Sequence, residues 1–388
     1  MRYSQRMSDV KPSATLSITS RAKALLKEGE DVVILAAGEP DFDTPQVVKE
    51  AAVKAINEGF TKYTPASGTA GLKKAISRKL SHDNGLTYST DEIIVSCGAK
   101  HSLYNLFQVL LGSGDEVLII HPFWVSYPEM IKLAGGVPKT LKTSEKNGFK
   151  AGAEDIRSAI TPKTRAVIIN SPSNPAGVVY DKEELEAIAE VCLEKNIIAV
   201  SDEIYEKIIY DGKKHFSIAS VSEEMKKSTI LVNGVSKSYS MTGWRIGYLA
   251  GDKEIIKLIN TLQSHSTSNP CSISQVAAEC ALSSDLEGLM EDNRNEFLKR
   301  RDALVKLLSA VKGLNPFVPL GAFYLFCDIS GCGIDSMTFA KNLLEEKKVA
   351  LIPGGPFGDD RFIRISFATD LETLKEGVSR IRDWVSKL

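Results

Sequence analysis

One lysine in this sequence has neighbours that suit amine chemistry. Lys237 stands in "NGVSKSYSMTGWRIG", residues 233–247, where it follows an apolar run, is flanked by serines and is followed by Arg245. An amine that is partly desolvated and close to another cation has a lowered pKa and can act as a nucleophile. Most lysines are solvated surface residues, so this stretch alone leaves a lysine in a polar turn as the alternative.

A carboxylate and a phenol follow another apolar run. Asp202 and Tyr205 lie in "AVSDEIYEKIIY". The aspartate could cap a helix, which this residue type does well. It could instead be buried, and a buried carboxylate needs a cationic partner, such as a protonated ring nitrogen. Tyr205 is close enough in sequence to reach the same ligand.

Two turns offer further polar groups. In "NSPSNPAG", residues 170–177, prolines and a glycine surround Asn174 and stiffen the backbone. In "SCGAKHSLYNLF" a small-residue turn at Gly98 precedes a helix, where free N–H groups and the helix dipole favour an anion. Neither a Walker motif nor a G-x-G-x-x-G fingerprint is present there, so a plain loop and a plain tight turn remain alternatives.

These residues need a scaffold that brings them together. Between residues 91 and 250, short apolar runs such as "EVLII", "RAVIINS" and "TILVNGV" alternate with amphipathic segments, which predicts an α/β fold with a mostly parallel sheet flanked by helices. Ligands bind at the carboxyl ends of such strands, so we expect one shared cleft. An amine with an acidic partner for a ring nitrogen is typical of pyridoxal phosphate enzymes.

We expect two domains. The large, cofactor-binding domain is predicted for residues 46–284. Residues 285–388, which contain "AFYLFCDI" and "FIRISFA" between helical segments, are predicted to form a smaller α+β domain. Residues 1–45 are expected to supply an N-terminal arm and part of that small domain.

Bulk composition narrows the functional classes. The chain has 388 residues, 43% hydrophobic and 25% charged, with a formal net charge of -1. These values are typical of a soluble globular protein and give no basic field for nucleic acid. No apolar run is long enough for a membrane span or a signal core. The six cysteines form no C-x-x-C pair, so we expect reduced thiols, no metal site and a cytoplasmic protein.

Several stretches together resemble the fold-type I, class I aminotransferases, and within them the bacterial aspartate aminotransferase branch. They occur in the family's order over nearly the whole chain: "KPSATLS", "AAGEPDFDTP", "TKYTP", "GAK", "PFWVSYPEM", "NSPSNPAG", "SDEIYE", "VSKSYSMTGWRIGY", "GAFYLF" and "IRISFAT". The resemblance implies pyridoxal 5'-phosphate as cofactor and a homodimer with shared active sites. Where the family often has N-N-P-T-G or H-N-P-T-G, this chain has Ser173 and Ala176 around Asn174.

The resemblance also implies how the cofactor is held. Lys237 would form the Schiff base and move the proton at the substrate's α-carbon, Asp202 would pair with the pyridine nitrogen, and Trp124 would stack on the ring. Tyr205 and Asn174 would hydrogen-bond the phenolic oxygen. The phosphate would be bound by backbone N–H groups and side chains, including a tyrosine from the neighbouring subunit: Gly98, Ala99, Lys100, Ser236, Arg245 and the partner's counterpart of Tyr63.

For the substrate, the resemblance assigns Arg364 and the backbone of Gly38 to the α-carboxylate, with Trp124 and Asn174 beside it. Lys100, Ser13 and Thr15 match residues that receive the distal carboxylate, which implies transamination of L-aspartate with 2-oxoglutarate to give oxaloacetate and L-glutamate. Prephenate or aromatic amino acid transamination is the near alternative. A pyridoxal phosphate β-lyase on the same fold is a further one, and a non-catalytic ligand sensor is the alternative outside enzymes.

Overall fold

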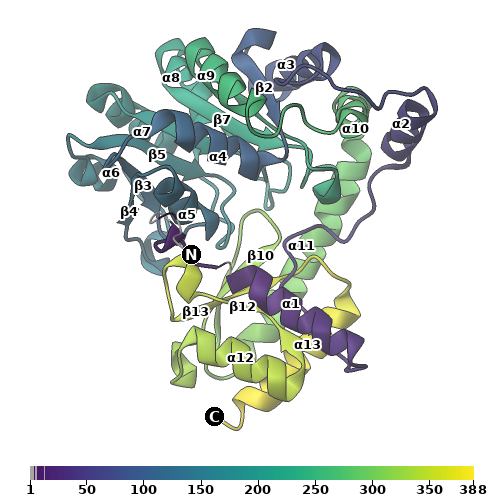
Figure 1. Ribbon diagram of the computed structural model, residues 1–388. Coiled ribbons are helices and arrows are strands. Elements are labelled where there is room, and N and C mark those ends of the chain that lie inside the picture. The colour runs from purple at the N-terminus through teal and green to yellow at the C-terminus, as the bar shows by residue number, and fades with distance from the viewer. Residues whose placement is uncertain (1–3, 5–6, 13) are drawn as a thin grey trace.

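The computed structural model describes residue 4, residues 7–12 and residues 14–388. Two sheets organise the chain (Figure 1), a large one with helices on its faces and a small antiparallel one with helices packed beside it. The expected α/β fold with a mostly parallel large sheet and a smaller α+β part is confirmed.

The large sheet has seven strands in the order β2-β8-β7-β6-β5-β3-β4. β8 alone runs antiparallel to its neighbours β2 and β7, whereas the pairs from β7 to β4 are parallel. The bounds are β2 Ile93–Ser96, β3 Glu116–Ile120, β4 Val137–Leu141, β5 Thr164–Asn170, β6 Ile198–Asp202, β7 Thr229–Gly234 and β8 Gly247–Ala250.

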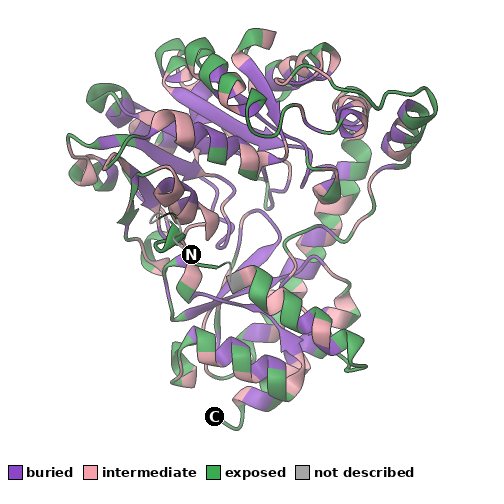
Figure 2. Cartoon of the chain, in the orientation of Figure 1, coloured by how far each residue is buried: buried purple, intermediate pink, exposed green. Residues whose placement is uncertain are grey.

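The central strands are buried, as the apolar runs predicted (Figure 2). Helices cover them on both faces, which is why these strands read as continuous apolar segments. The helices of this part are α2 Gln46–Asn57, α3 Ala70–Asn84, α4 Ala99–Leu110, α5 Ser126–Leu133, α6 Ala153–Ala159, α7 Lys182–Lys195, α8 Glu223–Lys227, α9 Lys253–Ser264 and α10 Ser272–Ser283.

The small sheet has the order β12-β13-β10-β9, and a separate parallel pair joins β1 to β11. Its strands are β1 Val33–Ile34, β9 Asn315–Phe317, β10 Tyr324–Asp328, β11 Val349–Ala350, β12 Ile352–Pro353 and β13 Phe362–Ser366. α11 Glu287–Ser309 runs from the large part to the small one (Figure 1), where it is joined by α1 Ala14–Lys27, α12 Ser336–Lys347 and α13 Leu371–Val385.

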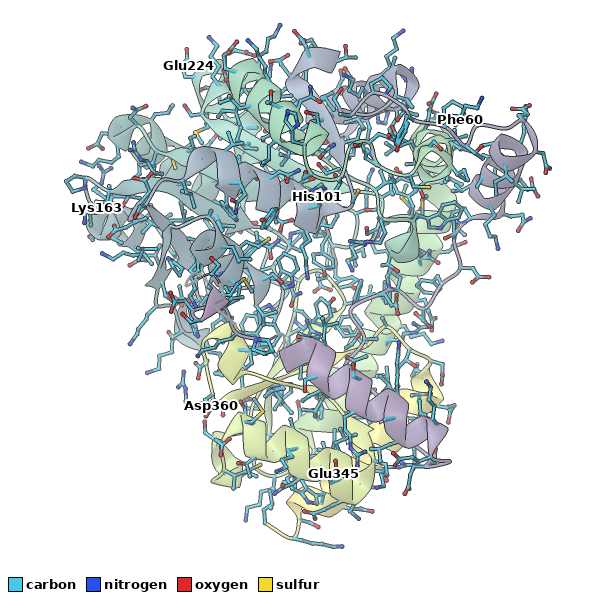
Figure 3. The ribbon with its side chains drawn as sticks, viewed as in Figure 1. Phe60, His101, Lys163, Glu224, Glu345 and Asp360 are labelled. Carbon is cyan, nitrogen blue, oxygen red and sulfur yellow. The ribbon has the colours of Figure 1, made fainter. Side chains whose placement is uncertain are left out.

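A shared apolar core connects the two parts. The segment after β6 contributes Tyr205, Ile208 and Tyr210 to the cluster that contains Phe323 and Tyr324 of the small part. Side chains fill the space between the sheets (Figure 3), where His101 marks the first turn of α4 and Asp360 the loop before β13. Among the described residues, no helix is both long and apolar enough to cross a membrane.

Candidate active site

The carboxylate predicted at the end of β6 is buried. Asp202 is 4% exposed, and its Oδ2 accepts a hydrogen bond of 2.5 Å from the Tyr127 hydroxyl. Burial raises the pKa of Asp202 to about 6, although the hydrogen bonds from Tyr127 and from the Ile204 N–H oppose that rise. Asn170, at the end of the adjacent β5, donates from Nδ2 to the Asp202 carbonyl at 3.0 Å. The neighbouring strand ends therefore meet, as the parallel arrangement predicted.

The amine predicted after β7 lies close to this carboxyl edge. Lys237 Nζ donates to the Gly38 carbonyl at 2.5 Å and lies 5.9 Å from the centre of the Tyr205 ring. Burial lowers the pKa of Lys237 to about 8; Glu39 opposes the change, while Arg364 and further cations add to it. At pH 7 an amine with this pKa is still mostly protonated, but its neutral, nucleophilic fraction is far larger than that of an ordinary lysine.

The turn after β2 forms a concave backbone site beside a guanidinium. Gly98 has φ +88°, and a Cβ added there would lie 2.5 Å from Arg245 Nη2. The Gly98 N–H donates to the Ser96 carbonyl at 2.7 Å. The N–H groups of Ala99 and Lys100 begin α4, where no intrahelical acceptor precedes them. A helix start next to an arginine suits an anion such as a phosphate group.

The arginine predicted to bind a carboxylate lies in β13 of the small sheet. Arg364 is 2% exposed, and its Nη1 and Nη2 donate to Asn174 Oδ1 at 3.0 Å and to the Ala36 carbonyl at 3.2 Å. Its Nε is buried without a partner, and no ion pair to a carboxylate is found for it within the described chain. A buried cation with an unused donor is suited to receive an anionic ligand.

Some of the remaining predicted residues lie beside those already described, and others do not. Lys100 Nζ lies 5.0 Å from the centre of the Trp124 ring, and that ring packs edge-on against Tyr127 at 5.3 Å. Ser236 is buried next to Lys237, and Thr15 is half-buried in α1. Tyr63 is 92% exposed, so its own chain does not bury it in this site. Ser13 lies outside the described residues.

Comparison with known proteins adds an independent finding. Residues 30–381 match the family described as aminotransferase class I and II. The chain is 51% identical to the aspartate aminotransferase of Bacillus subtilis over the whole of both proteins. It is 48% identical to a probable aspartate/prephenate aminotransferase of Rickettsia bellii over 97% of each chain.

The chain belongs to the class I and II aminotransferases. Solved structures agree with this assignment. The aspartate aminotransferase of Rhizobium meliloti superposes with a TM-score of 0.96 at 42% identity, over all of both chains. The Thermus thermophilus enzyme, solved with maleate, gives 0.95 at 44% identity, over 99% of this chain and 100% of that one. The family predicted from the sequence motifs is therefore confirmed.

Sequence reasoning missed two side chains that contact the predicted site of this aminotransferase. They are Tyr127, which binds Asp202, and Tyr324, whose hydroxyl lies 3.1 Å from that of Tyr205. Both lie inside stretches already quoted for the family resemblance, "PFWVSYPEM" and "GAFYLF". The sequence marked these two tyrosines only by their place in motifs that also contain predicted ligand-binding residues.

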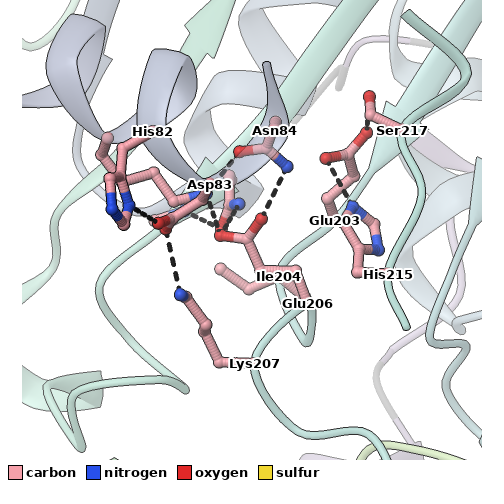
Figure 4. Close-up of polar contacts among 12 residues, drawn as sticks. His82, Asp83, Asn84, Glu203, Ile204, Glu206, Lys207, His215 and Ser217 are labelled. Carbon is pink, nitrogen blue, oxygen red and sulfur yellow. Dashed lines mark hydrogen bonds and ion pairs between the residues drawn. The ribbon is translucent and has the colours of Figure 1, made fainter. Parts of the chain in front are cut away.

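An ionic network anchors the segment that follows Asp202 (Figure 4). Glu206 pairs with Lys79 of α3 and accepts hydrogen bonds from Asn84 and Asn233. Burial alone would raise the pKa of Glu206, but Lys79 and His215 lower it to about 2. Because this network ties α3 and β7 to the chain around Tyr205, it fixes the backbone on which the site residues stand.

Three possible ligand atoms of this network, from Glu203, Glu206 and His215, lie within 4.8 Å of one another. Their oxygens already have partners: Glu203 accepts from Ser201 at 2.7 Å and pairs with His215 at 2.9 Å, and Glu206 is held as described. Internal hydrogen bonds and ion pairs thus account for the cluster, and we assign no metal to it.

Proposed function

We propose that this aminotransferase uses pyridoxal 5'-phosphate to transfer the amino group of L-aspartate to 2-oxoglutarate. One observation carries the proposal: besides burial, three cations, Arg364, Arg245 and Lys100, act on the Lys237 amine to lower its pKa, and Glu39 opposes them. A phosphorylated cofactor and a substrate with two carboxylates would bring negative charges to these cations.

The residues present fit the cofactor. At position 98 the turn has no room for a side chain, because a Cβ there would collide with Arg245. Glycine therefore leaves the start of helix α4 open to a phosphate. Asp202 supplies a buried carboxylate for the ring nitrogen. When bound, pyridoxal phosphate supplies an electron sink for the bond that breaks at the substrate's α-carbon.

The chain's own groups then position the substrate and move a proton. Arg364 binds the α-carboxylate as a planar fork, helped by Asn174, and so fixes the direction of the Cα–H bond. Lys237 would accept that proton at Nζ, since its lowered pKa of about 8 leaves part of the amine unprotonated. Tyr205 and Asn174 hold the ring's phenolic oxygen, and Trp124 covers the ring.

In this proposal, the choice of substrate depends on the residues that receive its distal carboxylate. Lys100 lies over Trp124, and we propose that it binds the distal carboxylate together with Thr15; Ser13, to which the family resemblance gives the same role, lies outside the described residues. The predicted small domain, residues 1–45 with 285–388, closes over the substrate in this proposal. The similarity to enzymes named aspartate aminotransferase, one of them solved with maleate, supports the preference for a dicarboxylate.

A second chain completes the site in this proposal. Tyr63 is 92% exposed, and the neighbouring helix α2 exposes Val53 at 55% and Ile56 at 51%. Apolar side chains that gather on one exposed helix favour a protein interface. We propose a homodimer in which the partner's copy of Tyr63 reaches the phosphate. The six cysteines are unpaired, which supports a reducing compartment such as the cytoplasm.

Prephenate is the second candidate substrate, favoured by the relative named probable aspartate/prephenate aminotransferase. A half-reaction separates the two. The yellow cofactor-loaded enzyme is mixed in turn with L-aspartate, L-glutamate, L-phenylalanine and L-arogenate, and conversion of the cofactor to its amine form is followed by absorbance. Fast conversion by aspartate and glutamate supports the proposal. Failure with aspartate and fast conversion by arogenate would overturn it.

Two further measurements test the chemistry itself. Lys237→Ala should abolish multiple turnover, and normal turnover in that variant would disprove the mechanism. Release of pyruvate from cystathionine without an oxo acid acceptor would favour the β-lyase alternative.

A further inference from the structure

Tyr324 is a buried tyrosine that belongs to the small sheet and contacts the large part of the molecule. It is 1% exposed and begins β10. Its hydroxyl lies 3.1 Å from the Tyr205 hydroxyl, and the two rings meet edge-on at 5.9 Å. A Cβ added at Gly38 would lie 3.5 Å from the same hydroxyl. One side chain therefore lies close to two segments that are far apart in sequence.

The ring of Tyr324 supports the arginine. The guanidinium carbon of Arg364 lies 4.2 Å from the centre of that ring, nearer than to Phe357 at 5.2 Å. Within the described chain no carboxylate acts on the arginine, so its charge is compensated by the hydrogen bonds to Asn174 and the Ala36 carbonyl and by the negative face of the Tyr324 ring. The ring thus lies against a guanidinium whose Nε is buried without a partner.

The hydroxyl of Tyr324 determines how Tyr205 can donate. Each phenol has one hydrogen to donate, and each oxygen can also accept. Once the Tyr205 hydroxyl donates to a ligand oxygen, the hydrogen bond between the two tyrosines must run from Tyr324 to Tyr205. A donor that itself accepts a hydrogen bond is polarised and donates more strongly.

We propose that Tyr324 is a positioning residue that orients Arg364 through its ring and strengthens Tyr205 as a donor through its hydroxyl. This inference rests on the proposed function, in which those two residues hold the substrate's α-carboxylate and the cofactor's ring oxygen. One side chain of the small sheet thereby links the substrate-binding arginine to the cofactor contact on the large sheet.

The two contacts can be removed separately. Tyr324→Phe keeps the ring and loses the hydroxyl. In the cofactor-loaded enzyme, a weaker Tyr205 leaves the ring oxygen more basic, so the pH midpoint of the yellow chromophore should rise by about half a unit. The KM for aspartate should change little. Tyr324→Leu also loses the ring and should weaken binding of maleate and raise the KM for aspartate by roughly tenfold.

A double-mutant comparison excludes a merely structural role. In a Tyr205→Phe background, adding Tyr324→Phe should no longer move the midpoint, because the hydroxyl it acts through is absent. Tyr210→Phe is the matched control. It removes a hydroxyl that donates a 2.5 Å hydrogen bond to the carbonyl of Ala322, two residues before Tyr324, and it leaves the hydroxyl of Tyr205 unchanged. It should leave the midpoint unchanged.

The outcomes separate this inference from the proposed function. If the unaltered enzyme fails to convert its cofactor with aspartate, the proposed function is wrong. If it reacts normally, the inference is overturned by an unchanged midpoint in Tyr324→Phe, by an equal shift in Tyr210→Phe, or by unchanged maleate affinity in Tyr324→Leu. Should Tyr324→Leu not fold, the Phe variants and their double mutant still decide.

Discussion

The Tyr127 hydroxyl donates a 2.5 Å hydrogen bond to Asp202 Oδ2 inside the carboxyl edge of the large sheet. This bond opposes the effect of burial, which raises the pKa of Asp202 to about 6. Tyr127 therefore helps to keep the carboxylate ionised, and only the ionised form can pair with a protonated ring nitrogen.

Tyr127→Phe should weaken cofactor binding in a pH-dependent way. Without the hydroxyl the pKa of Asp202 rises further, so a larger fraction is protonated near pH 6.5 than near pH 8. The dissociation constant for pyridoxal phosphate should increase about tenfold at the lower pH, the size of one lost hydrogen bond to a charged group. Equilibrium titration of cofactor-free protein measures it. Tyr104→Phe, on the exposed side of α4, is the control, and an equal loss at both pH values would indicate general packing damage instead.

Gly98→Ala should damage the phosphate turn through a collision with Arg245. The added Cβ would lie 2.5 Å from Nη2 at a φ of +88°. Gly114 provides a matched control, since its φ is +83° and an added Cβ meets nothing within 4 Å. Both alanine variants should lose roughly 1 kcal/mol of stability from backbone strain. Only Gly98→Ala should also weaken phosphate-dependent cofactor binding, by tenfold or more; equal affinities in the two variants would contradict the proposed phosphate site.

The large sheet and the meeting of its strand ends could be predicted because buried parallel strands read as apolar runs and end at one edge. β4 could not: "VPKTL" is an edge strand with mostly exposed residues, so no apolar run marks it. The roles of Tyr127 and Tyr324 depend on partners 75 and 119 positions away. No local pattern encodes such contacts, whereas Lys237 and Asp202 were indicated by their place after a strand.

Arg364→Met should make the protein more stable while removing the proposed substrate contact. The arginine is 2% exposed, and burial lowers its pKa. Replacing a buried charge by an apolar side chain of similar length should raise the free energy of unfolding by roughly 1–4 kcal/mol. Urea unfolding at fixed cofactor and protein concentration measures this gain. In the proposed function the same variant should also lose binding of maleate.

Arg300→Met provides the contrast for that prediction. Arg300 is also buried, but it pairs with Asp41 at 2.7 Å and with Glu296 at 3.1 Å. Removing it leaves two carboxylates without their partner, so this variant should be less stable than the unaltered protein. If both arginine variants were destabilised alike, the prediction would be wrong, and the buried charge of Arg364 would not lower the free energy of unfolding.

Lys237 should make the stability of the cofactor-free protein rise with pH above about 8. Its pKa in the folded chain is about 8, below the ordinary lysine value of 10.5. Between these two values the unfolded chain binds a proton that the folded chain does not. Stability therefore increases with pH across this window, at most by about 1.4 kcal/mol per unit for one proton, and the unfavourable contribution is fully present below pH 8.

Urea unfolding at pH 7.5, 9 and 10 measures that slope in the cofactor-free protein. Lys237→Met should remove the part of the slope that belongs to this proton, so the stability difference between variant and unaltered protein should shrink as the pH rises. Lys257→Met, at an exposed lysine of α9, should leave the slope unchanged. A pH-independent difference for Lys237→Met would mean that the amine is fully protonated throughout this range, and an amine in that state cannot accept the α-proton near neutral pH.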